Sequence, residues 1–398
     1  MPPQKPSKRL HILVFSTLFP HVGEPTQGIF VENRLRHLLK DEEVDATVIA
    51  PVPWFPFKNG VFGKYGRAAK ADYVEVRDGL TIYHPRYFVI PKVGMMLTPI
   101  FLAYAAKKMA LRLIGQGVNF DLIDAHYLFP DGVAAAELAR KIKLPFTLTA
   151  RGSDVTQIAL MSRPKPLILK ACSAAKQVIT VSQSLKEKLV AIGASEHNIS
   201  VLRNGVDSEK FRPVANARSQ IFEQLGLDPG KPTILYAGWL IQRKRVDIVI
   251  DAISNLPNVQ AIIVGDGPLR RSLEMRLKTQ NLESRIKFTG QKTPQEMPSY
   301  FSAVDVLCLP SEREGWANVM LESMACGAAV VARRVDGATE LIVGDAPGQL
   351  VDGDDPIAYA NAIQSILLDL PKRDFVRSFA LQYSWRSTSA KQMEIFEK

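Results

Sequence analysis

The sequence contains very little cysteine. Its three cysteines, among 398 residues, are scattered at positions 172, 308 and 326. They are too few for the disulfide framework of a small secreted protein, and their spacing does not match a zinc site. This scarcity favours a reducing compartment, so we expect a cytoplasmic protein.

The sequence also lacks an apolar run long enough to cross a bilayer. The longest uncharged run, residues 93–106, has fourteen residues, whereas a membrane-spanning helix needs about 20. The opening KPSKRLHILVFSTLF begins like a signal peptide, but no small-residue cleavage site follows, and Pro20, His21 and Gly23 indicate a turn. We therefore predict a first β-strand in a globular protein whose 46% hydrophobic residues can form sizeable cores.

Acidic residues are scarce in the first half of the chain. Residues 1–212 hold 29 Lys and Arg against 18 Asp and Glu, whereas residues 213–398 hold 21 against 22. A basic half is typical of proteins that meet anionic lipid head groups, phosphorylated substrates or nucleic acid. Ordinary solubility charge is the alternative explanation.

Short β-branched or apolar runs alternate with longer amphipathic segments along the whole chain. This alternation predicts βαβ units around parallel sheets, and hence an α/β fold. The expected strands are 10–19, 46–50, 122–125, 146–149, 178–181, 199–202, 233–237, 260–264, 286–289, 306–309 and 329–332.

The alternation divides into two series, which predict two doubly wound domains. Asn204 and Gly205 indicate a turn, and the polar stretch 207–219 is a plausible linker. We expect an N-terminal domain over 1–206 and a C-terminal domain over 207–379, with a final helix over 380–398 that packs back on the first domain. Ligands of such sheets bind at the carboxyl ends of the strands, so we expect two facing domains with the site in the cleft between them.

One connecting helix is well marked in the sequence. Ser184 and Glu187 have the spacing of a capping box, an apolar face follows, and Gly193 can close the helix.

Two glutamates, Glu314 and Glu322, stand in a stretch that otherwise looks buried, EGWANVMLESMACGAAVVA. The pattern predicts a strand, a loop that carries Glu314, and a helix from about residue 317 to 326. Asn318 and Val319 fall in its first turn, where N–H groups favour an anion such as a diphosphate. Carboxylates beside an anion site need another role, and accepting hydrogen bonds from sugar hydroxyls is such a role. The alternative is an exposed helix glutamate and an N-terminal glutamate that interacts with the helix dipole.

The stretch SEREGWANVMLESMACGAAVVA resembles the Glu-x7-Glu signature of the retaining, family-4 glycosyltransferases of GT-B fold. Further stretches fit the order of that family: DAHYLFPDG, VSQSLKEKL, VLRNGVD, YAGWLIQRKRVD, VGDGPLRR, GATELI and GQLVDGDD. The early FPHVGEPTQGIFVE is similar to the donor-side glycine loop of polysaccharide-assembly members. The resemblance covers nearly the whole chain and implies two Rossmann-like domains.

The resemblance assigns roles to the glutamates and to a basic cluster. It implies that Glu322 binds the ribose hydroxyls of the donor and that Glu314 contacts the transferred sugar. Lys244 matches the lysine that neutralises the donor diphosphate. Trp239 stands where the family has arginine, so Arg243 or Arg245 would supply the missing phosphate contact; an exposed basic turn is the alternative.

The resemblance also implies roles in the first half and in VGDGPLRR. His126 matches a histidine that hydrogen-bonds the donor sugar. Arg151 and Asp154 would bind the acceptor or pair with each other. Gly28 lets the backbone approach the donor phosphate or simply closes a turn. Gly265 begins a turn near the nucleotide; because the third glycine of a dinucleotide fingerprint is absent, NAD binding is not expected.

Residues 93–106, followed by Lys107, Lys108 and Arg112, predict a helix with apolar and basic sides. Such a helix suits an anionic membrane surface, and burial against the sheet is the alternative.

Together these features predict a hexosyltransferase that moves a sugar from a UDP- or GDP-sugar to a saccharide or lipid-linked acceptor in cell-surface polysaccharide biosynthesis. Neither a metal nor another cofactor is expected, although Asp352, Asp354 and Asp355 resemble a metal cluster, and nucleic acid is not expected as a partner. The protein would be cytoplasmic, with peripheral association at the inner membrane face. A nucleotide-sugar epimerase of the same architecture and a non-catalytic polyanion-binding protein are the alternatives.

Overall fold

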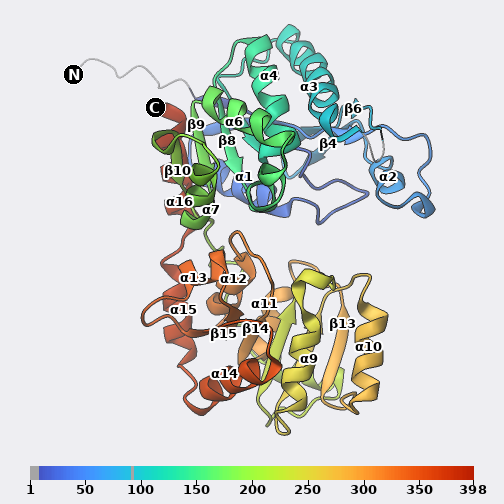
Figure 1. The fold of residues 1–398 in the computed structure, drawn as a ribbon, viewed down its shortest axis with the longest axis vertical. Coiled ribbons are helices and arrows are strands. Elements are labelled where there is room, and N and C mark those ends of the chain that lie inside the picture. Colours follow the sequence, from blue (N-terminus) through green and yellow to red (C-terminus); the bar gives the residue numbers. More distant parts are fainter. Residues whose placement is uncertain (1–8, 91–93) are drawn as a thin grey trace. The chain divides into compact units, whose positions relative to one another are not determined.

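The computed structural model describes residues 9–90 and 94–398 and divides the chain into two compact units (Figure 1). Unit 1 comprises the chain up to Arg203 together with Trp385–Lys398, and unit 2 comprises Asn204–Ser384. Each unit has a parallel sheet with helices packed on it, which confirms the predicted α/β class.

The main sheet of unit 1 has the strand order β10-β9-β8-β7-β1-β2-β5-β4, and its neighbours are parallel except for β4 and β5. A separate pair, β3 and β6, lies beside it. The strands of unit 1 are β1 (Leu10–Phe15), β2 (Val44–Ile49), β3 (Val52–Pro53), β4 (Val74–Arg77), β5 (Leu80–Tyr83), β6 (Arg86–Tyr87), β7 (Leu122–His126), β8 (Phe146–Ala150), β9 (Gln177–Thr180) and β10 (Ile199–Val201).

Helices connect these strands and cover the faces of the sheet. The α-helices of unit 1 are α1 (Ile29–Asp41), α2 (Gly63–Ala68), α3 (Thr98–Gly115), α4 (Val133–Ile142), α5 (Ser153–Thr156), α6 (Pro164–Ala174), α7 (Gln183–Ala191) and α16 (Trp385–Glu397). Short helical turns are η1 (Gly60–Phe62), η2 (Gly94–Met96), η3 (Leu128–Gly132), η4 (Ile158–Leu160) and η5 (Glu196–Asn198).

The sheet of unit 2 is parallel throughout, in the order β13-β12-β11-β14-β15-β16. Its strands are β11 (Thr233–Ala237), β12 (Gln260–Val264), β13 (Ile286–Gly290), β14 (Val306–Leu309), β15 (Ala329–Arg333) and β16 (Gly348–Val351). Its helices are α8 (Ala217–Leu225), η6 (Gln242–Lys244), α9 (Val246–Ser254), α10 (Arg270–Thr279), α11 (Met297–Ala303), α12 (Asn318–Ala325), α13 (Asp336–Leu341), α14 (Pro356–Leu368) and α15 (Arg373–Leu381).

The strands are buried because helices cover both faces of each sheet. Every residue of β7, β8, β11 and β12 is buried, which explains why their sequences read as continuous apolar runs rather than as alternating patterns. Helix α1 contributes Val31, Leu35 and Leu38 to the core of unit 1, at the spacing of one helical face. These sheets hold the strand ends, and the loops that follow them, in fixed positions.

Two predictions of local structure need correction. The first strand ends at Phe15, not at residue 19, because Ser16 and Thr17 form side-chain hydrogen bonds with Asp131 instead of continuing the sheet. The helix predicted to begin with a Ser184 capping box begins instead at Ser182, whose hydroxyl accepts the N–H of Leu185 at 3.3 Å. Ser184 already lies inside α7.

Helix α16 belongs to unit 1 although unit 2 precedes it in the chain. Its Phe396 joins the core beneath α1, and its Ile395 contacts Ile179 and Leu202. Trp385 stacks on His37 with ring centroids 5.1 Å apart. The last helix therefore completes the core of the first domain.

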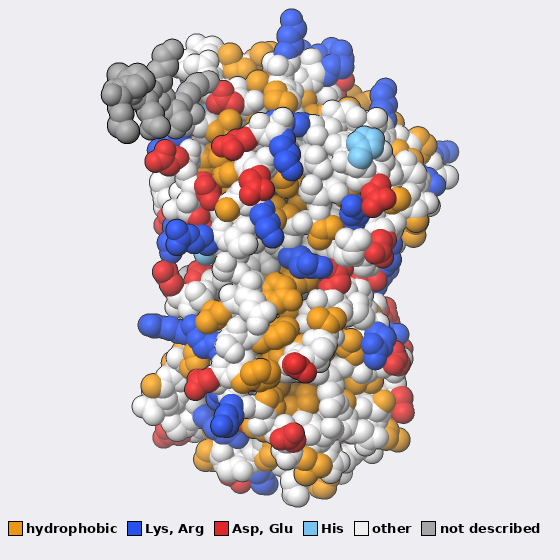
Figure 2. All heavy atoms as spheres, turned by 90° about the vertical axis from the view of Figure 1, so that its left-hand side faces the viewer, with side chains coloured by type: hydrophobic (Ala, Val, Ile, Leu, Met, Phe, Trp, Pro, Cys, Tyr) orange, Lys and Arg blue, Asp and Glu red, His pale blue; other side chains and the backbone are white. Residues whose placement is uncertain are grey.

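None of the helices in the described ranges is both long and apolar enough to cross a membrane. On the side of unit 1 that Figure 2 presents, acidic and basic side chains are interspersed.

Candidate functional site

The order of strands in unit 2 indicates where a ligand would bind. The chain runs outward from β11 through β12 to β13 on one side, and outward from β14 through β15 to β16 on the other. Loops that leave adjacent strands in opposite directions open a crevice at the carboxyl ends of the strands. In unit 2 that position lies between the loops that follow β11 and β14.

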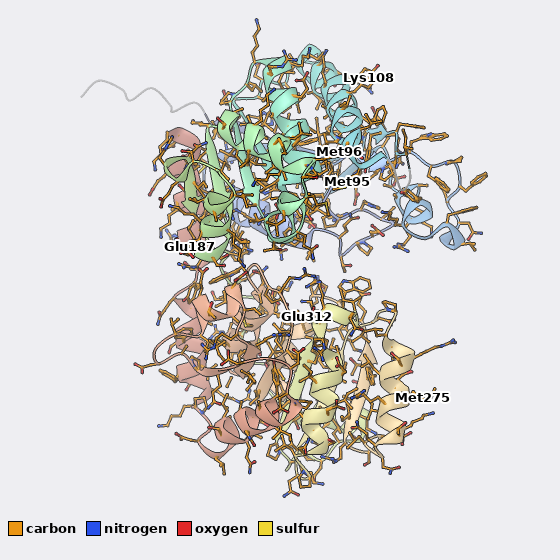
Figure 3. All side chains as sticks on the ribbon, viewed as in Figure 1. Met95, Met96, Lys108, Glu187, Met275 and Glu312 are labelled. Carbon is orange, nitrogen blue, oxygen red and sulfur yellow. The ribbon has the colours of Figure 1, made fainter. Side chains whose placement is uncertain are left out.

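Backbone hydrogen bonds hold these two loops together. The N–H of Glu312 donates to the carbonyl of Arg243 at 2.8 Å, and Nη1 of Arg243 donates to the carbonyl of Arg313 at 3.3 Å. Figure 3 labels Glu312, which lies in the loop that follows β14. The basic sequence QRKR and the acidic sequence EREG therefore meet in one place.

An ion pair joins the same loops. Nζ of Lys244 lies 2.5 Å from Oε1 of Glu314, and the side chains are only 14% and 13% exposed. Partial burial reduces the screening of this pair by water, so it is stronger than a surface ion pair. The structure thus brings together two of the three residues predicted to be catalytic, and it gives Lys244 a carboxylate partner.

Gly265 lets the loops after β11 and β12 approach closely. A Cβ atom at this position would lie 1.9 Å from the carbonyl oxygen of Gly238, and Gly265 has a φ of +142°. Only glycine fits here without moving the backbone. The N–H of Gly265 donates to the carbonyl of Gly290 at 2.9 Å, which ties in the loop after β13.

A cavity of about 200 Å³ opens beside these loops. It is lined from the loops after β11, β12 and β13 and from α11 and α12: Ala237, Gly238, Trp239, Val264, Gly265, Asp266, Gln291, Lys292, Met297, Phe301, Val319 and Glu322. Three residues predicted to bind the donor, Gly265, Val319 and Glu322, therefore line one cavity. Its mainly apolar wall with a few polar groups is typical of small-molecule sites.

Two carboxylates, Asp266 and Glu322, line this cavity, and Glu322 is the less exposed of them. Burial raises the pKa of Glu322 to about 7, and the distant positive charge of Lys210 lowers it only in part. A carboxylate with so few compensating groups is costly to leave ionised. Ligand hydroxyl groups that donate to Glu322 would replace the water it has lost.

Helix α12 also carries Asn318, another residue predicted to bind the donor. It begins at Asn318, whose Oδ1 accepts a hydrogen bond from Nδ2 of Asn204 at 3.1 Å. The first N–H groups of any α-helix have no acceptor within it and favour an anion. Trp239 lines the cavity and is 57% exposed, so the position that holds arginine in the family presents a flat aromatic surface here.

Arg245, predicted as an alternative to Arg243 for a phosphate contact, is held by carboxylates in this structure. Its Nε and Nη2 donate to Asp247, and its Nη1 donates to Asp354. Arg333 also contacts Asp354, at 2.5 Å. These carboxylates raise the pKa of the Arg245 guanidinium. Because it serves this ion-pair cluster, we do not include Arg245 in the proposed donor site.

The aspartates that resemble a metal cluster have other partners. Asp352 accepts from Arg334 at 2.9 Å, and Asp355 caps α14 by accepting the N–H of Ile357 at 3.0 Å. Within residues 9–90 and 94–398, no group of three His, Cys, Asp or Glu side chains is arranged to hold a metal ion.

In unit 1 the strand order reverses between β1 and β7, so a crevice is expected at the carboxyl ends of these two strands. His126 is the last residue of β7. His126 is only 2% exposed. Its Nδ1 accepts from Nη2 of Arg151 at 2.7 Å, and its Nε2 lies 3.2 Å from Asp124. Burial lowers the pKa of His126 to about 4, so the ring is neutral. A hydrogen bond from this ring to a sugar would require it to exchange one of these partners.

Arg151 and Asp154 do not pair through their side chains. The Asp154 carboxylate accepts the backbone N–H groups of Arg151, Gly152 and Leu128, at 2.7–3.1 Å, and so organises the turn after β8. The Arg151 guanidinium bonds His126 and lies over the ring of Phe30, 5.2 Å from its centroid. Asp154 therefore supports the backbone, and Arg151 positions His126.

The sequence interpretation missed Asp131, which connects the loop after β7 with the loop after β1 in unit 1. Its carboxylate accepts the N–H of Thr17 at 2.6 Å and the hydroxyl of Ser16 at 3.1 Å. Burial raises the pKa of Asp131 to about 7. Its position in FPDG, directly after the strand that ends at His126, is the signal that could have found it.

Gly28 has a structural reason to be glycine. It has a φ of +67°, and a Cβ atom there would lie 2.1 Å from the carbonyl oxygen of Leu18. Its carbonyl accepts the N–H of Val31 at 2.8 Å in the first turn of α1. These contacts favour the turn-closing alternative, and an approach to a donor phosphate stays a prediction.

Comparison with known proteins identifies the family. Residues 27–210 match the family model described as Glycosyltransferase Family 4, and residues 217–380 match that described as Glycosyl transferases group 1. The chain belongs to glycosyltransferase family 4. This family is retaining, and the predicted resemblance is confirmed.

One relative and two solved structures illustrate the similarity. TuaC, named as a teichuronic acid biosynthesis glycosyltransferase of Bacillus subtilis strain 168, is 28% identical over 335 residues, which cover 83% of each chain. Sucrose-phosphate synthase from Thermosynechococcus elongatus superposes with a TM-score of 0.76 at 21% identity, covering 98% of both chains. Anabaena HepE in complex with UDP and glucose gives 0.73 at 20% identity, covering 98% of this chain and 99% of that one. These structures confirm the GT-B fold of two Rossmann-like domains.

Proposed function

We propose that this family-4 glycosyltransferase moves a hexose from a UDP- or GDP-sugar to a saccharide or lipid-linked acceptor in the assembly of a cell-surface polysaccharide. The observation that carries the proposal is the Lys244–Glu314 ion pair at the strand switch point of unit 2. The loop after β11 that carries Lys244 also lines the cavity, through Trp239, together with Glu322 of α12. The UDP in the HepE complex and the TuaC relative support the donor and the pathway.

Each group of the cavity has a task in this proposal. The nucleoside would lie against the apolar wall of Val264, Met297 and Phe301, and its ribose hydroxyls would donate to Glu322. The diphosphate would lie near Lys244 and the first turn of α12. A negative ligand at Lys244 competes with Glu314 for the ammonium group, and Glu314 can then accept a hydroxyl of the transferred sugar.

The reaction breaks the bond between the anomeric carbon and the diphosphate oxygen, and the bonding electron pair leaves with the diphosphate. The acceptor oxygen bonds the anomeric carbon on the same face, and its proton passes to the departing diphosphate oxygen. Because charge grows on the diphosphate during this step, Lys244 and Arg243 would stabilise the transition state more than the ground state. Three buried, free cysteines, Cys172, Cys308 and Cys326, suit a reducing cytoplasm.

The proposal can be tested without knowledge of the acceptor. Thermal unfolding with UDP, GDP, ADP and their sugar conjugates should show a raised midpoint for one nucleotide class, because a ligand of the folded state stabilises it. The donor should then be incubated alone and with lipid-linked oligosaccharide extracts. Glycosylated acceptor supports the proposal; an isomerised donor sugar formed without acceptor would identify an epimerase instead.

Glu322 should make nucleotide binding depend on pH. Hydroxyl donors stabilise the ionised carboxylate, so binding is strongest above the pKa of about 7 in the free protein and weakens as the pH falls below it. Glu322→Gln should weaken binding about 10- to 100-fold at pH 8, because it removes hydrogen bonds to a charged group. Calorimetric titration from pH 5.5 to pH 8, roughly spanning this pKa, measures both effects.

The same titration of Glu322→Gln controls for the ionisation of the nucleotide phosphate, which both proteins share. Subtracting the two pH profiles should leave the transition of one carboxylate. If the wild-type and variant profiles are parallel, Glu322 does not bind the ribose.

A further inference from the structure

We propose that helix α3 docks unit 1 on an anionic lipid surface. A helix packed on a sheet needs one apolar face, and α3 uses such a face: Leu102, Ala106, Met109 and Leu113 are buried. However, α3 has a second apolar stripe on the opposite side. The large hydrophobic side chains exposed along it are Leu97, just before the helix, and Ile100, Tyr104, Leu111 and Ile114.

The exposed side chains share one side of the helix, where Lys107 lies between Tyr104 and Leu111. Ile100, Tyr104, Leu111 and Ile114 fall within about 80° of one another at 100° per residue. Ile100 is 62% exposed and Tyr104 is 72% exposed. The sequence left two alternatives for this helix, burial against the sheet and contact with a membrane surface. The structure is compatible with both at once, because one face of α3 is buried in unit 1 and the opposite face is apolar and exposed.

A groove between α3 and α4 extends this apolar surface. The two helices lie side by side in Figure 1 and pack together. The groove has a volume of about 390 Å³ and is lined by Pro99, Ile100, Ala103, Tyr104, Lys107, Val133, Glu137 and Lys141. Its floor is apolar, and its one carboxylate, Glu137, is already paired with Arg140 at 2.7 Å. Such a groove can receive part of an acyl chain beneath a head group.

All charged side chains of α3 are basic, which favours an anionic partner. Lys107, Lys108 and Arg112 lie on the helix, and residues 79–120 contain no Asp or Glu. Lys108 points outward from α3 in Figure 3. Lysine and arginine beside an exposed apolar stripe can reach phosphate groups while their stems cover apolar surface.

The same charges argue against a second copy of the chain. Two α3 helices face to face would place three cations of one against three of the other, with no carboxylate on either helix. An anionic lipid surface offers both acyl chains for the stripe and phosphates for the cations. The inference does not rest on the proposed transferase activity, because binding to lipid needs neither donor nor acceptor.

Co-sedimentation with vesicles tests the proposal on the full chain. The wild-type protein should pellet with vesicles of equal parts phosphatidylcholine and phosphatidylglycerol, and only weakly with phosphatidylcholine alone. Lys108→Gln/Arg112→Gln should weaken binding to the anionic vesicles by about 30-fold, because each cation near such a surface is worth a factor of about five. Ile100→Ser/Tyr104→Ser should also release the protein, since it removes the apolar stripe.

Matched variants on unit 2 provide the controls. Arg271→Gln/Lys278→Gln removes two exposed cations from α10, and Met275→Ser/Leu368→Ser removes two exposed apolar side chains, of which Met275 is labelled in Figure 3. Both should pellet like the wild type, and all four variants should keep the wild-type circular dichroism spectrum and urea unfolding midpoint, which shows that they fold.

Four results would overturn the proposal. They are no binding of the wild type to anionic vesicles, equal binding to neutral ones, equal losses in the unit 2 controls, or a dimer in solution that Ile100→Ser/Tyr104→Ser abolishes. The last result would assign the stripe to a second copy. Because the assay contains no sugar donor, a failure here leaves the transferase proposal intact, and the reverse also holds.

Discussion

Lys244→Met should lower kcat by about 100- to 1,000-fold, the loss typical of removing one preorganised donor from a site of developing charge. Methionine keeps the length of the side chain but removes the ammonium group that lies 2.5 Å from Glu314. The departing diphosphate then meets the uncompensated carboxylate of Glu314 instead of a cation. Initial rates with saturating donor and acceptor, together with nucleotide titration, measure the effect on turnover and on binding.

Lys278→Met is the matched control, because Lys278 is exposed on α10 of the same unit. It should leave kcat and nucleotide affinity at their wild-type values. Restoring the charge as Lys244→Arg should recover only part of the rate, since guanidinium and ammonium groups differ in shape and hydration. A Lys244→Met enzyme with wild-type kcat would remove Lys244 from the mechanism.

Arg34→Met should lower the free energy of unfolding of the protein by about 3–5 kcal/mol, the cost of removing one partner from a buried charged network. Arg34 is 1% exposed, and its Nε donates to Oε1 of Gln392 on α16 at 2.7 Å. Nε2 of Gln392 in turn donates to Asp124 at 3.2 Å, and Asp124 contacts His126. The substitution leaves the Asp124 carboxylate buried without its nearby guanidinium and loosens α16. Urea unfolding followed by circular dichroism measures the change.

Arg36→Met, on the same helix, is the control for this variant. Arg36 is 28% exposed and pairs with Glu32 at 2.6 Å, and Glu32 keeps Arg77 as a second partner at 3.2 Å. The loss of Arg36 should therefore cost about 1–2 kcal/mol, less than the loss of Arg34. Limited proteolysis should cut α16 from Arg34→Met faster than from Arg36→Met. Equal stability of the two variants would show that the Arg34 network does not hold α16 in place.

The site in unit 2 could be predicted largely from the sequence because its chemistry is local to short segments. Glu314 and Glu322 were placed on a loop and the following helix, and the structure has that loop and α12. The helix was predicted over 317–326 and spans Asn318–Ala325. Turn and cap signals act over a few residues, so the sequence records them directly.

The partners of these residues could not be predicted in the same way. The resemblance singled out Lys244 and left Arg243 and Arg245 as alternatives for a phosphate contact. In the structure Lys244 pairs with Glu314, whereas Arg245 pairs with Asp247 and Asp354. The difference arises because Arg245 has a φ of +49° at the start of α9 and turns its side chain away. A charge pattern gives the composition of a cluster, but the backbone direction at each residue decides which charges meet.

The sequence by itself determined the α/β class, the position of most strands and the family to which the chain belongs, because burial and turn chemistry repeat locally at the periods of strands and helices. Only the tertiary structure decided that Asp131 joins β1 to β7, that Gln392 reaches Asp124 across 268 residues, and that α3 keeps a second apolar face exposed. These features depend on which strands become neighbours and which helix faces the sheet leaves uncovered. The order of the strands and the packing of the helices determine these neighbours and these exposed faces, and no local stretch of the sequence encodes either.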